Sequence, residues 1–244
     1  MARLQEIYNK QGYLTGLPIL SKTELIEARR AFSELEKQFS EEYTKYHLHN
    51  VHLECEWVMS LAKHPRLLQA VTAILGPDVI LAVKANENPQ ENELPYVAWH
   101  QDMRYWSIAG GPVLSVWLAL DDSLKENGAL QVIPGSHCSG ILPHRQARRP
   151  GNMLSVNQEI PGELVEAEKA VLCPLLAGQM SIHDGLLVHA SDPNTSQRRR
   201  CGFVIRYVPT CTYPIQDPDR PRKFRATVVV SGQDQFNHFS NNSP

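Results

Sequence analysis

The spacing of hydrophobic positions divides the chain into a helical beginning and a β-rich remainder. Apolar residues recur at steps of three and four over residues 25–46, directly after a capping box that Ser21 opens. This pattern predicts a long amphipathic helix. A second helix is predicted from Pro65 to Gly76, where the Gly-Pro pair is a usual helix end. Residues 1–77 are therefore expected to form a helical N-terminal part.

From residue 78 onward the helical period gives way to short β-prone runs separated by Gly, Pro, Asn and Asp. The runs cover residues 79–83, 113–120, 129–133, 171–176, 180–182, 186–188 and 203–208. Many short strands without alternating helices predict an antiparallel barrel or jelly roll, so the fold class is mainly β with N-terminal helices.

The β-rich part is expected to belong to one domain that spans residues 1–244. Residues 78–210 form its predicted β core. A long polar loop at about 135–162 is a candidate lid, because long unstructured connections in compact domains often cover sites. Residues 211–244, rich in Pro, Asp and Arg, are predicted to be a surface tail.

Composition and charge narrow the kind of partner. The 244 residues are 42% hydrophobic, and 24 basic against 26 acidic residues give a formal net charge of −2. No basic field is present to recruit nucleic acid or an anionic membrane. Five cysteines without a Cys-x-x-Cys pair, no apolar membrane span and no apolar signal core indicate reduced thiols and a cytoplasmic location. A small-molecule partner is expected, and the oligomeric state stays open.

Residues 96–106 carry the most informative chemistry. In an extended segment, residues two apart point to the same side, so His100 and Asp102 would present an imidazole and a carboxylate to one point. Two His and one carboxylate with open coordination positions form the facial triad of non-haem Fe(II) oxygenases. Alone, the pair fits a surface strand with a hydrogen-bonded His better than it fits a metal site, so a second distant imidazole is required.

That second imidazole has two candidates, His183 and His189. Asp184-Gly185 is a hairpin signal, which predicts that His183 ends one strand and His189 ends the next. The residues that follow favour His189: Ser191 comes two positions later and Arg200 eleven positions later. Arginine is the side chain best suited to bind a carboxylate through two parallel hydrogen bonds.

Four ordered motifs in this sequence resemble the phytanoyl-CoA dioxygenase family of Fe(II)/2-oxoglutarate oxygenases. They are Trp-His-Gln-Asp-x-x-Tyr-Trp at 99–106, Val-Trp-Leu-Ala-Leu-Asp-Asp at 116–122, Glu-Asn-Gly-Ala-Leu-Gln-Val-Ile-Pro-Gly-Ser-His at 126–137, and His-Ala-Ser-Asp-Pro-Asn at 189–194 with Arg200. The resemblance covers roughly residues 5–210. It implies a double-stranded β-helix, a cupin-like jelly roll whose open end holds the iron.

The resemblance also implies a role for each matching residue. The iron ligands, which are the catalytic centre, fall on His100, Asp102 and His189. Arg200 would bind the distal carboxylate of 2-oxoglutarate, and Ser191 would hydrogen-bond it. Two further residues are expected at the cosubstrate: Trp117 lining its pocket and Gln101 in contact with it. The implied reaction uses Fe(II), 2-oxoglutarate and O2, hydroxylates an unactivated C–H bond, and releases succinate and CO2.

Several residues are weaker candidates. Arg206 shares a strand face with Arg200 but would lie about 20 Å along it, near the metal by resemblance, or it would be an ordinary strand arginine. Lys84 is either the equivalent of the lysine in the family's apolar-x-Lys-x-Pro sequence, which can reach the cosubstrate or substrate, or a charged strand end, because the segment is shorter here. The candidate substrate residues are Arg104, Tyr105, Trp106, Asn157 and Gln158, although Tyr105 and Trp106 fit the core equally well. A basic cluster in the lid, His144, Arg145, Arg148 and Arg149, suggests an anionic substrate or simply a solvated loop face.

Three functions follow from these alternatives. The complete triad with Arg200 favours a hydroxylase that acts on a small, possibly anionic, organic molecule. The short segment at 79–95 leaves room for a jelly-roll binding or regulatory protein with a degenerate iron site. A halogenase is disfavoured, because the related halogenases carry Ala or Gly where this chain has Asp102.

Overall fold

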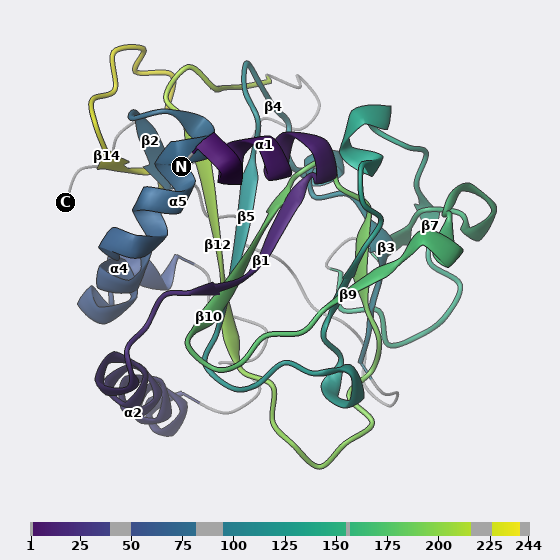
Figure 1. Cartoon of the computed structure of the whole chain (residues 1–244), viewed down its shortest axis with the longest axis horizontal. Coiled ribbons are helices and arrows are strands. Elements are labelled where there is room, and N and C mark those ends of the chain that lie inside the picture. The colour runs from purple at the N-terminus through teal and green to yellow at the C-terminus, as the bar shows by residue number, and fades with distance from the viewer. Residues whose placement is uncertain (1, 40–49, 82–94, 155–156, 216–225, 240–244) are drawn as a thin grey trace.

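Two antiparallel sheets face each other and enclose the functional residues between them. The structure is a computed structural model, and residues 2–39, 50–81, 95–154, 157–215 and 226–239 are described. In Figure 1 the larger sheet stands in the centre and the smaller one beside it, at the right. This arrangement confirms the predicted jelly roll, a double-stranded β-helix.

The larger sheet has six strands, in the order β1 (Tyr13–Pro18), β10 (Gln179–Asp184), β5 (Leu114–Ala119), β12 (Gly202–Pro209), β2 (Val79–Leu81) and β14 (Val228–Ser231). The smaller sheet has four, in the order β3 (Val97–His100), β11 (His189–Ser191), β6 (Leu130–Val132) and β9 (Val171–Cys173). Two short ribbons complete the β structure: β4 (Ile108–Ala109) with β13 (Tyr213–Pro214), and β7 (Arg145–Gln146) with β8 (Gln158–Glu159).

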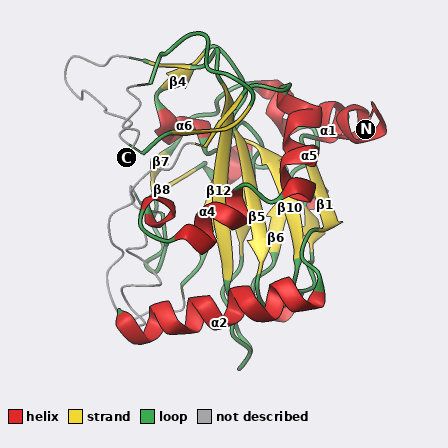
Figure 2. Cartoon of the chain, turned by 90° about the vertical axis from the view of Figure 1, so that its left-hand side faces the viewer, coloured by secondary structure: helices red, strands yellow, loops and turns green. Residues whose placement is uncertain are grey.

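The described helices belong mostly to the N-terminal part. They are α1 (Ala2–Gln11), α2 (Lys22–Gln38), α4 (Glu56–Ala62), α5 (Pro65–Leu75) and α6 (Met103–Trp106). Five 3-10 turns lie between them and the strands: Val51–Leu53, Lys125–Asn127, Ser136–Ser139, Gly162–Leu164 and Ala167–Lys169. Figure 2 shows α2 running across one end of the large sheet. None of the described helices is long and apolar enough to cross a membrane.

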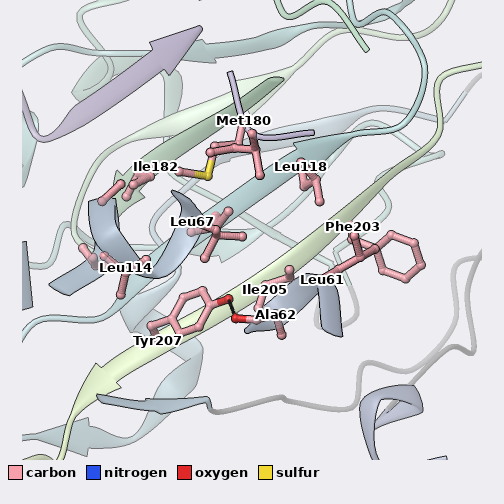
Figure 3. Close-up of a cluster of buried hydrophobic side chains, with 14 of the residues drawn as sticks. Leu61, Ala62, Leu67, Leu114, Leu118, Met180, Ile182, Phe203, Ile205 and Tyr207 are labelled. Carbon is pink, nitrogen blue, oxygen red and sulfur yellow. Dashed lines mark hydrogen bonds between the residues drawn. The ribbon is translucent and has the colours of Figure 1, made fainter. Parts of the chain in front are cut away.

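Alternation along the central strands separates the core from the site. Side chains of a strand point alternately to its two faces. One face of β5, β10 and β12 carries the apolar residues that pack against α4 and α5, and several of them are labelled in Figure 3: Leu114, Leu118, Met180, Ile182, Phe203, Ile205 and Tyr207. The Tyr207 hydroxyl donates a 2.8 Å hydrogen bond to the Ala62 carbonyl, which ties the sheet to α4. The opposite face is left for the polar residues of the site.

Most predicted elements match the structure, with instructive exceptions. Helix α5 follows its prediction, whereas α2 ends at Gln38 and the predicted continuation lies outside the described residues. The run at 186–188 is a turn, and the strand starts only at His189. The tail prediction is wrong for β14, which pairs with β2, and for Phe239, which is buried. Sequence reasoning also missed α1 and β1.

Candidate active site

Two histidines lie side by side on neighbouring strands of the small sheet. His100 ends β3 and His189 begins β11, and they are direct partners in the antiparallel register with ring centroids 4.0 Å apart. Each Nδ1 lies 2.8 Å from the carbonyl oxygen two residues earlier, Ala98 for His100 and Leu187 for His189. Since a carbonyl only accepts, both Nδ1 atoms carry the hydrogen, and the lone pair of each ring is on Nε2. This tautomer is the one that binds metal through Nε2.

Asp102 completes the cluster. One ligand atom from each of His100, Asp102 and His189 lies within 4.8 Å of the others, and all three residues are buried. The predicted extended strand through His100 and Asp102 is wrong. Strand β3 ends at His100, and Asp102 has αR geometry as the N-cap of α6. Two imidazoles and one carboxylate, buried and correctly tautomerised, fit an Fe(II) ion with open coordination positions.

A row of three polar side chains supports Asp102 from the large sheet. His183 on β10 and Arg206 on β12 are both direct register partners of Ser115 on β5, so the three side chains share one face. The Ser115 hydroxyl donates to Asp102 Oδ2 in a short hydrogen bond, and Arg206 Nη2 lies 3.2 Å from Oδ1. His183 Nε2 stands 3.6 Å from Oδ2. The row fixes the orientation of the carboxylate toward the histidines.

Charges in the site keep the ligands in the forms that bind metal. Burial alone would raise the pKa of Asp102, but the Arg206 guanidinium and the nearby imidazoles outweigh it and hold that pKa well below its ordinary value. Burial, with His100 and His183 nearby, holds the pKa of His189 well below its ordinary value. Asp102 is therefore an anion and His189 is neutral near pH 7.

The free energy of unfolding of the metal-free protein is expected to fall as the pH drops below about 6.5. The unfolded chain protonates His189 near its ordinary pKa of 6.5, whereas the folded protein keeps the pKa of His189 well below that. The unfolded state therefore binds more protons, so this contribution to stability is complete above the unfolded pKa and declines as the pH falls toward the folded pKa. Urea unfolding at about pH 7.5 and about pH 5.5 measures the slope. The His189→Gln variant should flatten it, and an unchanged slope would contradict the assignment.

A cavity of about 760 Å³ extends from the cluster between the two sheets. Arg200, Ser191 and Trp117 line it together with the three cluster residues. Arg200 donates through Nη1 to the Gly128 carbonyl in a short hydrogen bond, and its guanidinium lies 5.8 Å from the Trp117 ring centroid. Within the described residues, Arg200 has no carboxylate at ion-pair distance. A half-buried cation that shares a cavity with this His-Asp-His cluster suits a dicarboxylate that spans the two.

The position of Gln101 does not agree with the predicted contact to the cosubstrate. It is fully buried, and its side-chain amide is committed to the backbone: Nε2 donates to the carbonyls of Gly140 and Leu186, and Oε1 accepts from the Leu142 N–H. No part of Gln101 lines the cavity. Its position between the metal-site turn and the lid therefore makes it a structural residue, not a cosubstrate contact.

The predicted substrate residues separate into two groups. Trp106 lines the cavity, and the Arg206 guanidinium lies 5.3 Å from its ring centroid. The Arg104 side chain is exposed, and neither Arg104, Asn157 nor Gln158 lines the cavity. Lys84 and the side chain of Tyr105 lie outside what the structure describes.

Sequence reasoning missed the apolar wall of the cavity. Its members come from both sheets and from the lid: Pro95, Val97, Leu130, Met153, Leu154, Ala190 and Val204. Only Val204 could have been found from the sequence, because it alternates with Arg206 on the same strand face. The predicted lid thus reaches the cavity through Met153 and Leu154 rather than through its polar residues.

The basic residues of the lid make their contacts away from the cavity. Arg145 Nε lies 3.1 Å from the Glu159 carboxylate, and the Arg149 guanidinium lies 4.4 Å from the Tyr96 ring centroid. None of His144, Arg145, Arg148 or Arg149 lines the cavity. The solvated-face interpretation of this cluster is therefore the better one.

Comparison with known proteins identifies a family model and several related sequences. The phytanoyl-CoA dioxygenase (PhyH) family model matches residues 8–202. L-proline trans-4-hydroxylase of Streptomyces griseoviridis is 29% identical over 211 residues, which cover 78% of each chain. A probable alpha-ketoglutarate-dependent hypophosphite dioxygenase of Stutzerimonas stutzeri is 25% identical over 68% of this chain and 58% of its own. A bovine phytanoyl-CoA dioxygenase domain-containing protein 1 is 32% identical, and the match covers half of its length.

Solved structures share the fold. The apo form of the non-heme monooxygenase ThoJ superposes with a TM-score of 0.76 and 28% identity, over 97% of this chain and 86% of that one. The epimerase SnoN, solved with Fe3+, alpha ketoglutarate and nogalamycin RO, gives a TM-score of 0.66 at 20% identity, over 96% of both chains. The family model spans most of the chain, including the cluster and Arg200. The chain belongs to the phytanoyl-CoA dioxygenase family.

Proposed function

We propose that this chain is an Fe(II)/2-oxoglutarate-dependent dioxygenase that hydroxylates an unactivated C–H bond of a small organic molecule. The observation that carries the proposal is the buried cluster of His100, Asp102 and His189, whose ligand atoms lie within 4.8 Å of one another in the wall of a cavity that Arg200 also lines. The names of the relatives, a proline hydroxylase and a hypophosphite dioxygenase, agree with this chemistry.

Each residue of the cavity has a defined task in this proposal. Bound Fe(II), with 2-oxoglutarate and O2, supplies the oxidising chemistry and yields succinate and CO2. Arg200 binds the distal carboxylate of 2-oxoglutarate, Ser191 donates a hydrogen bond to it, and Trp117 forms one side of its pocket. The apolar wall excludes water from the reacting end, where the substrate C–H bond must be held close to the metal.

The proposed function is tested by measuring succinate formation from 2-oxoglutarate. Protein loaded with Fe(II) under anaerobic conditions is exposed to O2, with and without fractions of a metabolite pool. We expect succinate to form only with iron, and one fraction to stimulate it. Protein kept metal-free with a chelator is the control.

The same assay separates the alternative function. A protein that binds iron and 2-oxoglutarate, yet forms no succinate with any fraction, would be a binding protein that kept the site. Of the segment that suggested this alternative, residues 79–95, the part at 82–94 lies outside the described residues, and no described feature favours the alternative. Failure to bind either iron or 2-oxoglutarate would overturn the site assignment itself.

A further inference from the structure

Arg206 has hydrogen-bonding capacity that its ion pair with Asp102 does not use. Only Nη2 contacts the carboxylate, at 3.2 Å. Nε is buried and has no partner among the described residues. The side chain is 19% exposed, and Arg206 is one of the residues that line the cavity. A guanidinium has five N–H donors, so Arg206 can bind a second acceptor from the cavity side.

His183, the next polar residue in the row, also has unused hydrogen-bonding capacity. It is 95% buried and lines the cavity, yet neither ring nitrogen has a hydrogen-bond partner among the described residues. Its distance of 3.6 Å from Asp102 Oδ2 is too long for a hydrogen bond. Buried polar groups in folded proteins almost always have a partner, so an imidazole with two unused nitrogens indicates a ligand that completes the site.

The net charge of the site with Fe(II) and 2-oxoglutarate bound indicates whether that ligand is an anion or a cation. Under the proposed function, the two negative charges of 2-oxoglutarate balance Fe(II), and the Asp102 carboxylate balances only one of the two arginines, Arg200 and Arg206. One positive charge remains in the cavity between the two sheets, where an uncompensated charge that is partly shielded from water is costly. The cations at the cavity mouth do not change this count, because Arg198 and Arg199 are paired with carboxylates: Arg198 with Asp122 and Glu126, Arg199 with Asp121 and Glu36.

We propose that Arg206, with His183 beside it, is the subsite for an anionic group of the substrate, a carboxylate or a phosphorus oxyanion. The inference rests on the proposed function and adds the substrate class to it. The anion would lie against Trp106 and next to Asp102, so it would anchor the molecule a few ångströms from the metal cluster and leave the rest along Val204 and Met153. The lid arginines, which first suggested an anionic substrate, do not reach the cavity.

The test is a binding experiment with matched probes. Protein loaded anaerobically with Fe(II) and saturating 2-oxoglutarate is titrated with butyrate and with butyramide, which differ in charge but hardly in shape. Methylphosphonate forms a third arm that separates a phosphorus oxyanion from a carboxylate. Calorimetry gives the dissociation constants. The visible absorption band of the Fe(II)–2-oxoglutarate chelate shows that the cosubstrate has not been displaced from Arg200.

We expect at least one anion to bind about tenfold or more tightly than butyramide, as a charge-assisted hydrogen bond provides. Arg206→Gln should abolish this preference, and Arg206→Lys should retain part of it. Arg148→Gln, a matched change in the lid, should leave it intact. The proposal would be overturned if the anions and butyramide bound with equal affinity, or if neither anion bound detectably. It would also be overturned if the preference for the anion were lost in Arg148→Gln but kept in Arg206→Gln.

Because Arg206 contacts a metal ligand, the iron and 2-oxoglutarate affinities of every variant are measured first. If Arg206→Gln no longer binds iron, the wild-type comparison of probes and the Arg206→Lys variant decide the question. A wild-type protein that fails to form the chelate band contradicts the proposed function. A wild-type protein that forms the band but shows no anion preference contradicts only the Arg206 subsite.

Discussion

Replacing Asp102 with Asn is expected to reduce iron-dependent succinate formation by more than about a hundredfold. The carboxylate is the only anionic member of the cluster, and the loss should exceed the 10- to 100-fold that removing a supporting group typically costs. Asn keeps the shape of the side chain and can still accept from Ser115. The missing charge is therefore the cause of the loss. The assay measures succinate at saturating 2-oxoglutarate, with iron affinity determined separately.

Asp192→Asn is the matched control for this variant. Asp192 lies directly after β11, is exposed, and contacts Gln131 rather than the cluster. It should keep wild-type succinate formation. If Asp102→Asn also retained activity within about tenfold of wild type, the carboxylate would not be a metal ligand.

The same substitution should also weaken the fold, because it leaves the Arg206 charge without its partner. Removing one member of a buried ion pair costs about 3 kcal/mol or more, whereas removing both members costs much less. The double variant Asp102→Asn with Arg206→Gln should therefore unfold at a higher urea concentration than additive single effects predict. Additive effects would show that the 3.2 Å contact contributes little to stability.

The three candidate metal ligands could be predicted from the sequence because their signals are local. His100 and Asp102 are two residues apart, and His189 stands at a fixed offset from Ser191 and Arg200. The supporting row could be predicted only in part: His183 and Arg206 were candidates for the site, but Ser115 was not, because the three residues come from separate strands. Only the register of three paired strands brings them opposite one another. That register depends on packing across the whole sheet rather than on any short motif.

The failed hairpin prediction shows the same limit. Asp184-Gly185 does turn the chain, but β10 pairs with β1 and β5, and β11 crosses to the small sheet. The Tyr8 hydroxyl donates a 2.6 Å hydrogen bond to Asp184 Oδ2, while Oδ1 accepts from the Leu186 N–H. The first helix therefore helps to fix a turn that lies more than 170 residues away in sequence. This turn places His183 and His189 on facing sheets, with ring centroids 4.3 Å apart.

Arg200→Gln is expected to raise the 2-oxoglutarate concentration required for half-maximal rate by about 100-fold or more, the equivalent of about 3 kcal/mol or more of lost binding. Arg200 is a half-buried cation whose pKa is lowered by desolvation, and no described carboxylate lies at ion-pair distance from it, so the cosubstrate is the expected counter-ion. The maximal rate should change much less, because the distal carboxylate stays bound throughout the reaction and contributes equally to ground and transition states. Arg198→Gln, an exposed neighbour already paired with Asp122, should leave both quantities unchanged. A fall in maximal rate without a higher 2-oxoglutarate requirement would place Arg200 at the substrate instead.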